Sequence, residues 1–173
     1  LLEEAGAKEQ DGRRKAIRVT KPVAIAIKDA QIRLLPSEVP QYTYDLDYSN
    51  TKAIGKQSYT MTLTRENFAR EIAPARTFGF LHELDALTKM GLGRGASLEN
   101  TLAIDGDTVV NKSLMRFPDE FVRHKILDAI GDMALAGGPL IARFEGVKSG
   151  HTTNNVVLRA LFADPANYEI VEI

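Results

Sequence analysis

Five short stretches rich in β-branched and aromatic residues follow one another within the first 63 residues, and they constrain the fold more than any other feature. Lys21-Pro22 and Asp29-Ala30 separate the first three stretches, as turn residues typically separate short antiparallel strands. The fourth stretch alternates Tyr or Leu with Thr or Asp in a strict period of two, so we expect one of its faces to be buried. The five predicted strands are residues 16–20, 23–28, 31–35, 41–48 and 57–63.

Two amphipathic helices are predicted in the second half of the chain. The longer one runs from about Pro118 to Ala136, with proline in its first turn and Gly137-Gly138-Pro139 as its stop. The shorter one runs from about His151 to Phe162. Four further elements are predicted: a Thr64-capped helix that ends at Pro74, a helix at about 81–89, a hairpin over 101–110 and a strand over 140–147.

Composition narrows the class of protein. The 173 residues include no cysteine, which excludes cysteine-ligated zinc, iron–sulfur clusters, thiol catalysis and disulfide scaffolds, and leaves His, Asp and Glu as metal ligands. A net charge of −1 gives no long-range attraction for polyanions, so we expect no nucleic-acid partner. No apolar run is long enough for a transmembrane segment, and the start lacks the basic region of a signal peptide, which predicts a cytoplasmic protein. The chain opens on Leu1, in what resembles the end of a helix, and is expected to be a piece of something longer.

The polar face of the longer helix is the first candidate site. At about 100° per residue, His124, Lys125, Asp128 and Asp132 fall within one arc of roughly 100°. His124 and Asp128 stand four residues apart, the spacing at which two helical side chains can reach one metal ion. The alternative is an ordinary ion pair on an exposed face.

Two further clusters have the residue types of a site. Lys148 to Asn155 places His151 at the start of a helix, where the alternative is a capping segment with an exposed histidine. In the segment Arg76 to Phe80, Phe78 and Phe80 bracket a glycine beside Thr77, so they could stack a ring and offer a hydrogen bond. Core packing is the alternative for these two aromatic side chains.

Four segments together carry a family resemblance. They are Ala75–Phe80, Gly91–Asn100, Asp119–Asp132, and Lys148–His151 followed by Asn154-Asn155. In this order they closely resemble the zinc-dependent UDP-3-O-acyl-N-acetylglucosamine deacetylases of lipid A biosynthesis. The resemblance covers nearly the whole chain, but only the second half of the family's protein.

The resemblance implies a fold and an activity. The family has two similar domains, each an α+β two-layer sandwich, in which a small, mostly antiparallel sheet carries two helices on one face (ribosomal S5 domain 2-like). Residues 1–173 would be the C-terminal domain, with a βαβ insert at about 84–110 that forms a passage for the acyl chain, and the N-terminal domain is absent from this chain. The activity would be removal of acetate from UDP-3-O-(3-hydroxyacyl)-N-acetylglucosamine in a bacterial cytoplasm, with loose association with the inner membrane as a further option.

The resemblance also implies the catalytic roles. His124 and Asp128 would be two of three protein ligands to Zn²⁺. Asp132 would orient and charge His151, which would act as general acid or electrostatic stabiliser. Thr77 would donate a hydrogen bond to the developing oxyanion.

The same resemblance implies the substrate contacts. Lys125 would lie beside the diphosphate, and Phe80 with Tyr48 would sandwich the uracil. Phe78 and Lys148 are assigned to the same substrate site. The partner molecule is therefore the UDP-linked acyl sugar.

One departure from the family limits what this chain can do alone. The third zinc ligand of the family is a His and its general base a neighbouring Glu, both in the first domain, and this chain has no such pair in its first half. A catalytic zinc site needs three protein ligands and a water, so the isolated chain is expected to be inactive. It is also expected to have lost part of the cover over apolar residues of its inner helix faces, namely Phe68, Ile72, Ile126 and Ile130. The alternative function for the isolated chain is a non-catalytic module that binds a nucleotide sugar.

Overall fold

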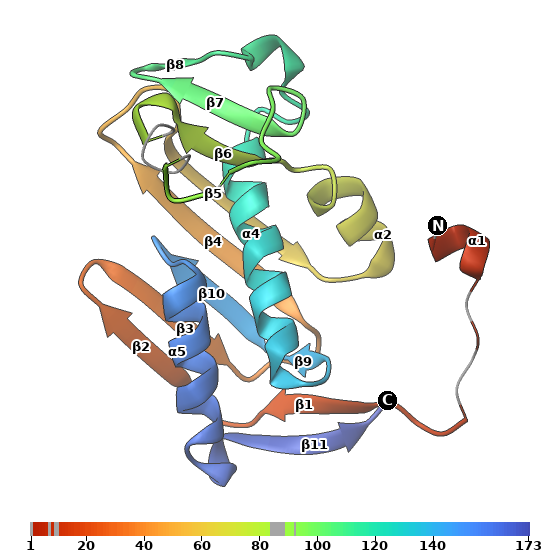
Figure 1. Ribbon diagram of the computed structural model, residues 1–173. Helices are drawn as coiled ribbons and strands as arrows, with labels where there is room; N and C mark the ends of the chain where they lie inside the picture. Colours follow the sequence, from red (N-terminus) through yellow and green to blue (C-terminus); the bar gives the residue numbers. More distant parts are fainter. Residues whose placement is uncertain (1, 7, 9–10, 84–88, 92) are drawn as a thin grey trace.

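The body of the protein has two layers, as Figure 1 shows. The computed structural model describes residues 2–6, 8, 11–83, 89–91 and 93–173. Helices α4 (Glu120–Met133) and α5 (His151–Phe162) pack against each other and against one face of a five-stranded sheet. The predicted α+β sandwich, with two helices on one face of a small sheet, is therefore confirmed.

The five-stranded sheet has the order β2-β3-β10-β4-β5. Every neighbouring pair is antiparallel except β10 and β4, which are parallel. The alternation predicted for β4 places Tyr42, Tyr44 and Leu46 in the core, each at most 4% exposed. The strands are β2 (Val23–Ile27), β3 (Ala30–Leu35), β10 (Arg143–Val147), β4 (Gln41–Tyr48) and β5 (Gly55–Thr62).

A second, three-stranded sheet corrects two of the predictions. Strand β1 (Lys15–Val19) does not continue into the sheet of its neighbour β2; it pairs antiparallel with β11 (Tyr168–Glu172) and parallel with β9 (Leu140–Ile141). The strand predicted over 140–147 is two strands in different sheets, because the chain leaves β9 at Ala142 and enters β10 one residue later. Strand β11 was not predicted.

A third sheet lies at the end of the body that carries the N-terminus of α4 (Figure 1). Its order is β6-β7-β8, with β6 (Thr77–Phe80) parallel to β7 (Thr101–Asp105) and β7 antiparallel to β8 (Thr108–Val109). The predicted hairpin is confirmed, and its turn uses Gly106 at φ 54°. The helix predicted at 81–89 falls on a range whose residues 84–88 lie outside the described part of the chain.

The helix boundaries follow the predicted caps except at the start of α4, which begins at Glu120 and leaves Pro118 outside the helix. Thr64 caps α2 (Arg65–Asn67), since its Oγ1 accepts a hydrogen bond from the Asn67 amide at 3.1 Å, and a π-helical turn at Phe68–Ile72 continues it. Helix α4 ends in a 3-10 turn at Ala134–Ala136 and stops at Gly137, whose φ of 86° favours glycine. Helix α1 (Leu2–Ala5) lies away from the body (Figure 1). Within the described ranges no helix combines the length and apolarity needed to cross a bilayer.

The core between sheet and helices decides which face of α4 remains polar. Val122, Ile126 and Ala129 of α4 are fully buried and pack into a cluster with Ile32 and Phe144 of the sheet. Their burial fixes the rotation of the helix, so that its polar side chains lie along the opposite edge. The candidate site is thus held by a rigid, packed element.

Candidate active site

The predicted cluster on α4 forms in the structure. The Nε2 atom of His124 lies 3.3 Å from Oδ1 of Asp128, and Nζ of Lys125 donates to Oδ2 of Asp128 at 2.7 Å. The three side chains are only 14–17% exposed, so they do not lie on an open polar surface. Burial at this level strengthens the interactions of these charged groups.

The protonation of His124 is set by a backbone contact. Its Nδ1 lies 3.2 Å from the carbonyl oxygen of Ala75, and because a carbonyl can only accept, Nδ1 carries the proton and Nε2 keeps its lone pair. Burial lowers the pKa of His124 below its ordinary value, and the opposite charge of Asp128 opposes this shift without reversing it. The imidazole is therefore neutral near pH 7, the form that binds metal ions.

The geometry of this pair fits half of a zinc site. Two ligand atoms at about 2.0–2.2 Å from a tetrahedral zinc lie about 3.4 Å apart, and the observed Nε2 to Oδ1 distance is 3.3 Å. An imidazole nitrogen and a carboxylate oxygen are both common zinc ligands. Within the described residues, no group of three or more His, Asp or Glu side chains could hold a metal ion. A complete site would need a ligand from outside the described residues.

A second polar cluster joins α4 to the start of α5. Oδ2 of Asp132 accepts from Nδ1 of His151 at 2.8 Å and from Nδ2 of Asn154 at 2.7 Å. His151 is 70% exposed, whereas Asn154 is 1% exposed. The carboxylate thus fixes the orientation of an accessible imidazole, and Asn154 helps to fix the carboxylate.

Asn154 was not among the predicted site residues. Its spacing of three from His151 places both on one face of α5, and this was the available signal. The capping alternative expected Ser149 or Thr152 to satisfy free amides, but the residue that does so is Thr153, whose Oγ1 accepts from the Gly150 amide at 2.8 Å. Capping and the histidine contact therefore coexist in the same segment.

The ring of Phe78 lies beside His124 and belongs to a cluster of aromatic side chains. The ring of Phe78 meets His124 edge-on at 6.3 Å and the buried Phe121 edge-on at 5.1 Å, between ring centroids. Tyr48 lies 5.9 Å from Phe78 and 6.0 Å from Phe80. Phe78, Tyr48 and Phe80 are all partly buried and pack against the core, so packing accounts for part of each side chain and leaves part of each exposed.

Lys148 directly follows β10, at the end of the main sheet where the parallel strand β4 carries Asp47 and Tyr48. Its backbone is left-handed, with φ 48°, and its Nζ lies 3.3 Å from Asp47 and 3.5 Å from Asp29. Hydrogen bonds from Ser49, aided by Lys148, lower the pKa of Asp47 to about 2. The lysine is thus already paired with carboxylates.

Thr77 begins β6 at an exposed position, two residues after the Ala75 carbonyl that holds His124. It also borders a mostly apolar cavity of about 380 Å³ in the third sheet. The other lining side chains include Phe78, Phe80, Leu81, Ala96 and Leu98. An apolar chain could occupy this cavity beside the polar cluster of α4.

Comparisons with known proteins identify relatives of this chain. The model of the UDP-3-O-acyl N-acetylglycosamine deacetylase family matches residues 1–163. Proteins named UDP-3-O-acyl-N-acetylglucosamine deacetylase are 44% identical over 98% of the chain in Phenylobacterium zucineum, 43% over 100% in Campylobacter fetus and 46% over 99% in Acinetobacter baumannii. The chain spans 57–58% of the length of these relatives.

Two helices on one face of a five-stranded sheet define a two-layer α+β domain. With the family model matching most of its length, the chain belongs to the UDP-3-O-acyl N-acetylglycosamine deacetylase family.

Proposed function

We propose that this chain is the C-terminal domain of a two-domain, zinc-dependent deacetylase of the bacterial cytoplasm. The enzyme removes the N-acetyl group from UDP-3-O-(3-hydroxyacyl)-N-acetylglucosamine in lipid A biosynthesis, and this chain supplies half of the active site. The observation that carries the proposal is one helix face that presents the His124–Asp128 pair and, one turn further on, the Asp132 that holds His151. The greater length of the relatives supports a missing domain, which would provide the third ligand and a general-base Glu.

The residues of this chain divide the chemistry between them. His124 and Asp128 would hold the zinc ion, which supplies polarisation of the amide carbonyl and a water of lowered pKa. Thr77 would donate a hydrogen bond to the oxygen that gains negative charge as water adds to the carbonyl carbon. His151, held by Asp132, would protonate the nitrogen as the carbon–nitrogen bond breaks, which yields acetate and a free amine.

The remaining site residues would bind the substrate. Tyr48 and Phe80 present aromatic faces suited to the uracil, and Phe78 supports them from the core side. Lys125 and Lys148 would approach the diphosphate, exchanging part of their pairing with carboxylates for it. The apolar cavity of the third sheet would take the acyl chain.

Substitution of the two ligands tests the proposal in the full-length protein. His124→Ala and Asp128→Ala should lose bound zinc together with activity, as measured by metal analysis of the purified protein and by acetate release. His151→Ala should keep its zinc and lose turnover by about 100-fold or more, the usual contribution of a general acid. His82→Ala, an exposed histidine outside the cluster, serves as the matched control and should keep its zinc.

Two results would count against these roles. Full zinc retention in Asp128→Ala would remove that residue from the ligand set. Nucleotide-sugar binding without any turnover in the full-length protein would favour the binding-module alternative.

A further inference from the structure

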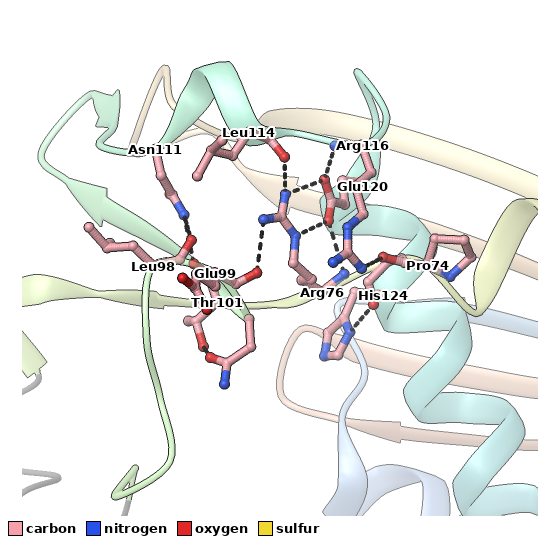
Figure 2. Close-up of polar contacts among 12 residues, drawn as sticks. Pro74, Arg76, Leu98, Glu99, Thr101, Asn111, Leu114, Arg116, Glu120 and His124 are labelled. Atoms are coloured by element: carbon pink, nitrogen blue, oxygen red, sulfur yellow. Dashed lines mark hydrogen bonds and ion pairs between the residues drawn. The ribbon is translucent and has the colours of Figure 1, made fainter.

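A buried ion pair lies outside the residues assigned so far. Nε of Arg76 donates to Oε1 of Glu120 at 2.8 Å and Nη2 donates to Oε2 at 3.2 Å, while the Arg76 amide also donates to Oε1 at 3.0 Å (Figure 2). The side chains are 6% and 0% exposed. The two-pronged contact fixes the relative orientation of two charged groups that water does not reach.

Arg76 also binds the two chain segments that flank the β7–β8 hairpin of the third sheet. Arg76 donates from Nη1 to the Glu99 carbonyl at 3.3 Å, just before β7, and from Nη2 to the Leu114 carbonyl at 2.5 Å, after β8 (Figure 2). Glu120 accepts from the Arg116 amide at 2.6 Å. Burial alone would raise the pKa of Glu120, but these hydrogen bonds outweigh it and lower the pKa, so the carboxylate is charged.

A separate residue, Asn111, links the strands and loops of the third sheet by hydrogen bonds. Asn111 is 5% exposed and donates from Nδ2 to the carbonyls of Leu98 and Thr101 at 2.7 and 2.8 Å. Its Oδ1 accepts from the Ala103 amide at 3.1 Å. The sheet and its flanking loops are therefore a connected unit, which the ion pair attaches to the first turn of α4.

The same segment is attached to α4 a second time, one turn further along. Glu120 and His124 are four residues apart on the helix; the first binds Arg76 and the second binds the Ala75 carbonyl. Two adjacent residues before β6 are thus tied to successive turns of the helix that carries the candidate zinc ligands. Thr77 and the apolar cavity follow directly.

We propose that Arg76 and Glu120 are a positioning pair, which holds the apolar cavity of the third sheet and Thr77 at a fixed place relative to His124 and Asp128. This inference rests on the proposed function, because it assigns the cavity to the acyl chain and the helix face to the reaction. Its consequence is specific: a substrate that occupies both places depends on the pair more than a substrate that occupies only one. The pair acts through other residues and does not touch the reacting atoms.

Arg76→Lys and Glu120→Gln in the full-length protein test the proposal. Lysine keeps the charge but cannot form the two-pronged contact, and glutamine keeps the shape but not the charge. With a long-acyl and a short-acyl substrate measured side by side, each variant should lower the ratio of kcat/KM values, long over short, by at least about tenfold, since small misplacements are costly in a bound complex. Arg33→Lys, which alters an exposed pair with Glu145 on the main sheet, is the matched control and should leave the ratio unchanged.

A second measurement needs no activity. Amide hydrogen exchange in the metal-free protein should become at least about tenfold faster in β7 of each variant, while β3 and β4 of the main sheet stay protected. If kcat/KM falls equally for both substrates and exchange rises equally in all sheets, the pair is only a stabilising contact and the proposal is overturned. If neither measurement changes, the proposal is equally overturned. If the wild-type protein has no deacetylase activity, but the faster exchange in the variants is still confined to the third sheet, the proposed function is refuted. The inference that the pair attaches the third sheet to α4 would then still stand.

Discussion

At the scale of single residues, substitution of Phe80 distinguishes a role in nucleotide binding from a role in core packing. The ring of Phe80 is partly buried and lies 6.0 Å from Tyr48 and 5.4 Å from His82, between ring centroids. Phe80→Ala in the full-length protein should therefore weaken UDP binding by about 1–3 kcal/mol, the range for stacking of a base on an aromatic ring. Calorimetric titration with UDP measures this, and the zinc content should not change. Unchanged UDP affinity in a protein of lowered melting temperature would instead assign Phe80 to the core.

The contacts of a site residue could be predicted from the sequence only where the partner lies a few residues away along the chain. The approach of His124 to Asp128 follows from their spacing of four on a helix, so the sequence predicted it. The hydrogen bond from His124 to the Ala75 carbonyl joins residues 49 apart, and no side-chain pattern reports a backbone carbonyl. Arg76 and Glu120 were missed for the same reason, because a charged residue in a sequence gives no sign that it will be buried against a distant partner.

At the scale of elements, the close packing of β10 against its neighbours gives a sharp test. A Cβ atom at Gly146 would lie 2.8 Å from the Phe144 ring, 2.8 Å from Oγ of Ser149 and 3.1 Å from the Tyr44 ring. Gly146→Ala should lower the free energy of unfolding by about 1–3 kcal/mol, the usual cost of overpacking a core. Gly95→Ala, where the added methyl group meets no atom within 4 Å, is the control and should change it by less than about 0.5 kcal/mol. Denaturant titration of the full-length variants measures both, and equal values would show that the strand can shift to make room.

Element types could be predicted well, but sheet membership could not. Strands β2 to β5 and helices α4 and α5 have periods and caps that act over a few residues, and these set their boundaries. The apolar run from residue 140 to residue 147 gave no sign that Ala142 divides it between two sheets. The pairing partners of strands β6 and β11 lie far away in the sequence, so no local pattern reported them.

At the scale of the whole molecule, the exposed apolar surface agrees only in part with the one expected from the sequence. Of the four residues expected to lose cover, Ile72 and Ile126 are fully buried within this domain, whereas Phe68 and Ile130 are partly exposed. Leu135, 70% exposed, and Phe162, 39% exposed, also reach the surface near the helices. They border one groove of about 370 Å³ beside the ends of α4 and α5. An exposed apolar groove of this kind favours association.

The isolated 173-residue chain should consequently be inactive, bind zinc weakly and self-associate. With His124 and Asp128 as its ligands, it should bind zinc at least about 100-fold more weakly than the full-length protein, since the loss of even an outer-shell partner costs 10–100-fold. Zinc titration and an acetate-release assay measure the first two properties, and analytical sedimentation measures the third. Leu135→Glu is the matched variant and should sediment as a monomer, because it places a charge in the apolar groove without touching the ligand pair. A monomeric wild-type chain that hydrolyses the substrate unaided would contradict the proposal, since the site would then be complete within these residues.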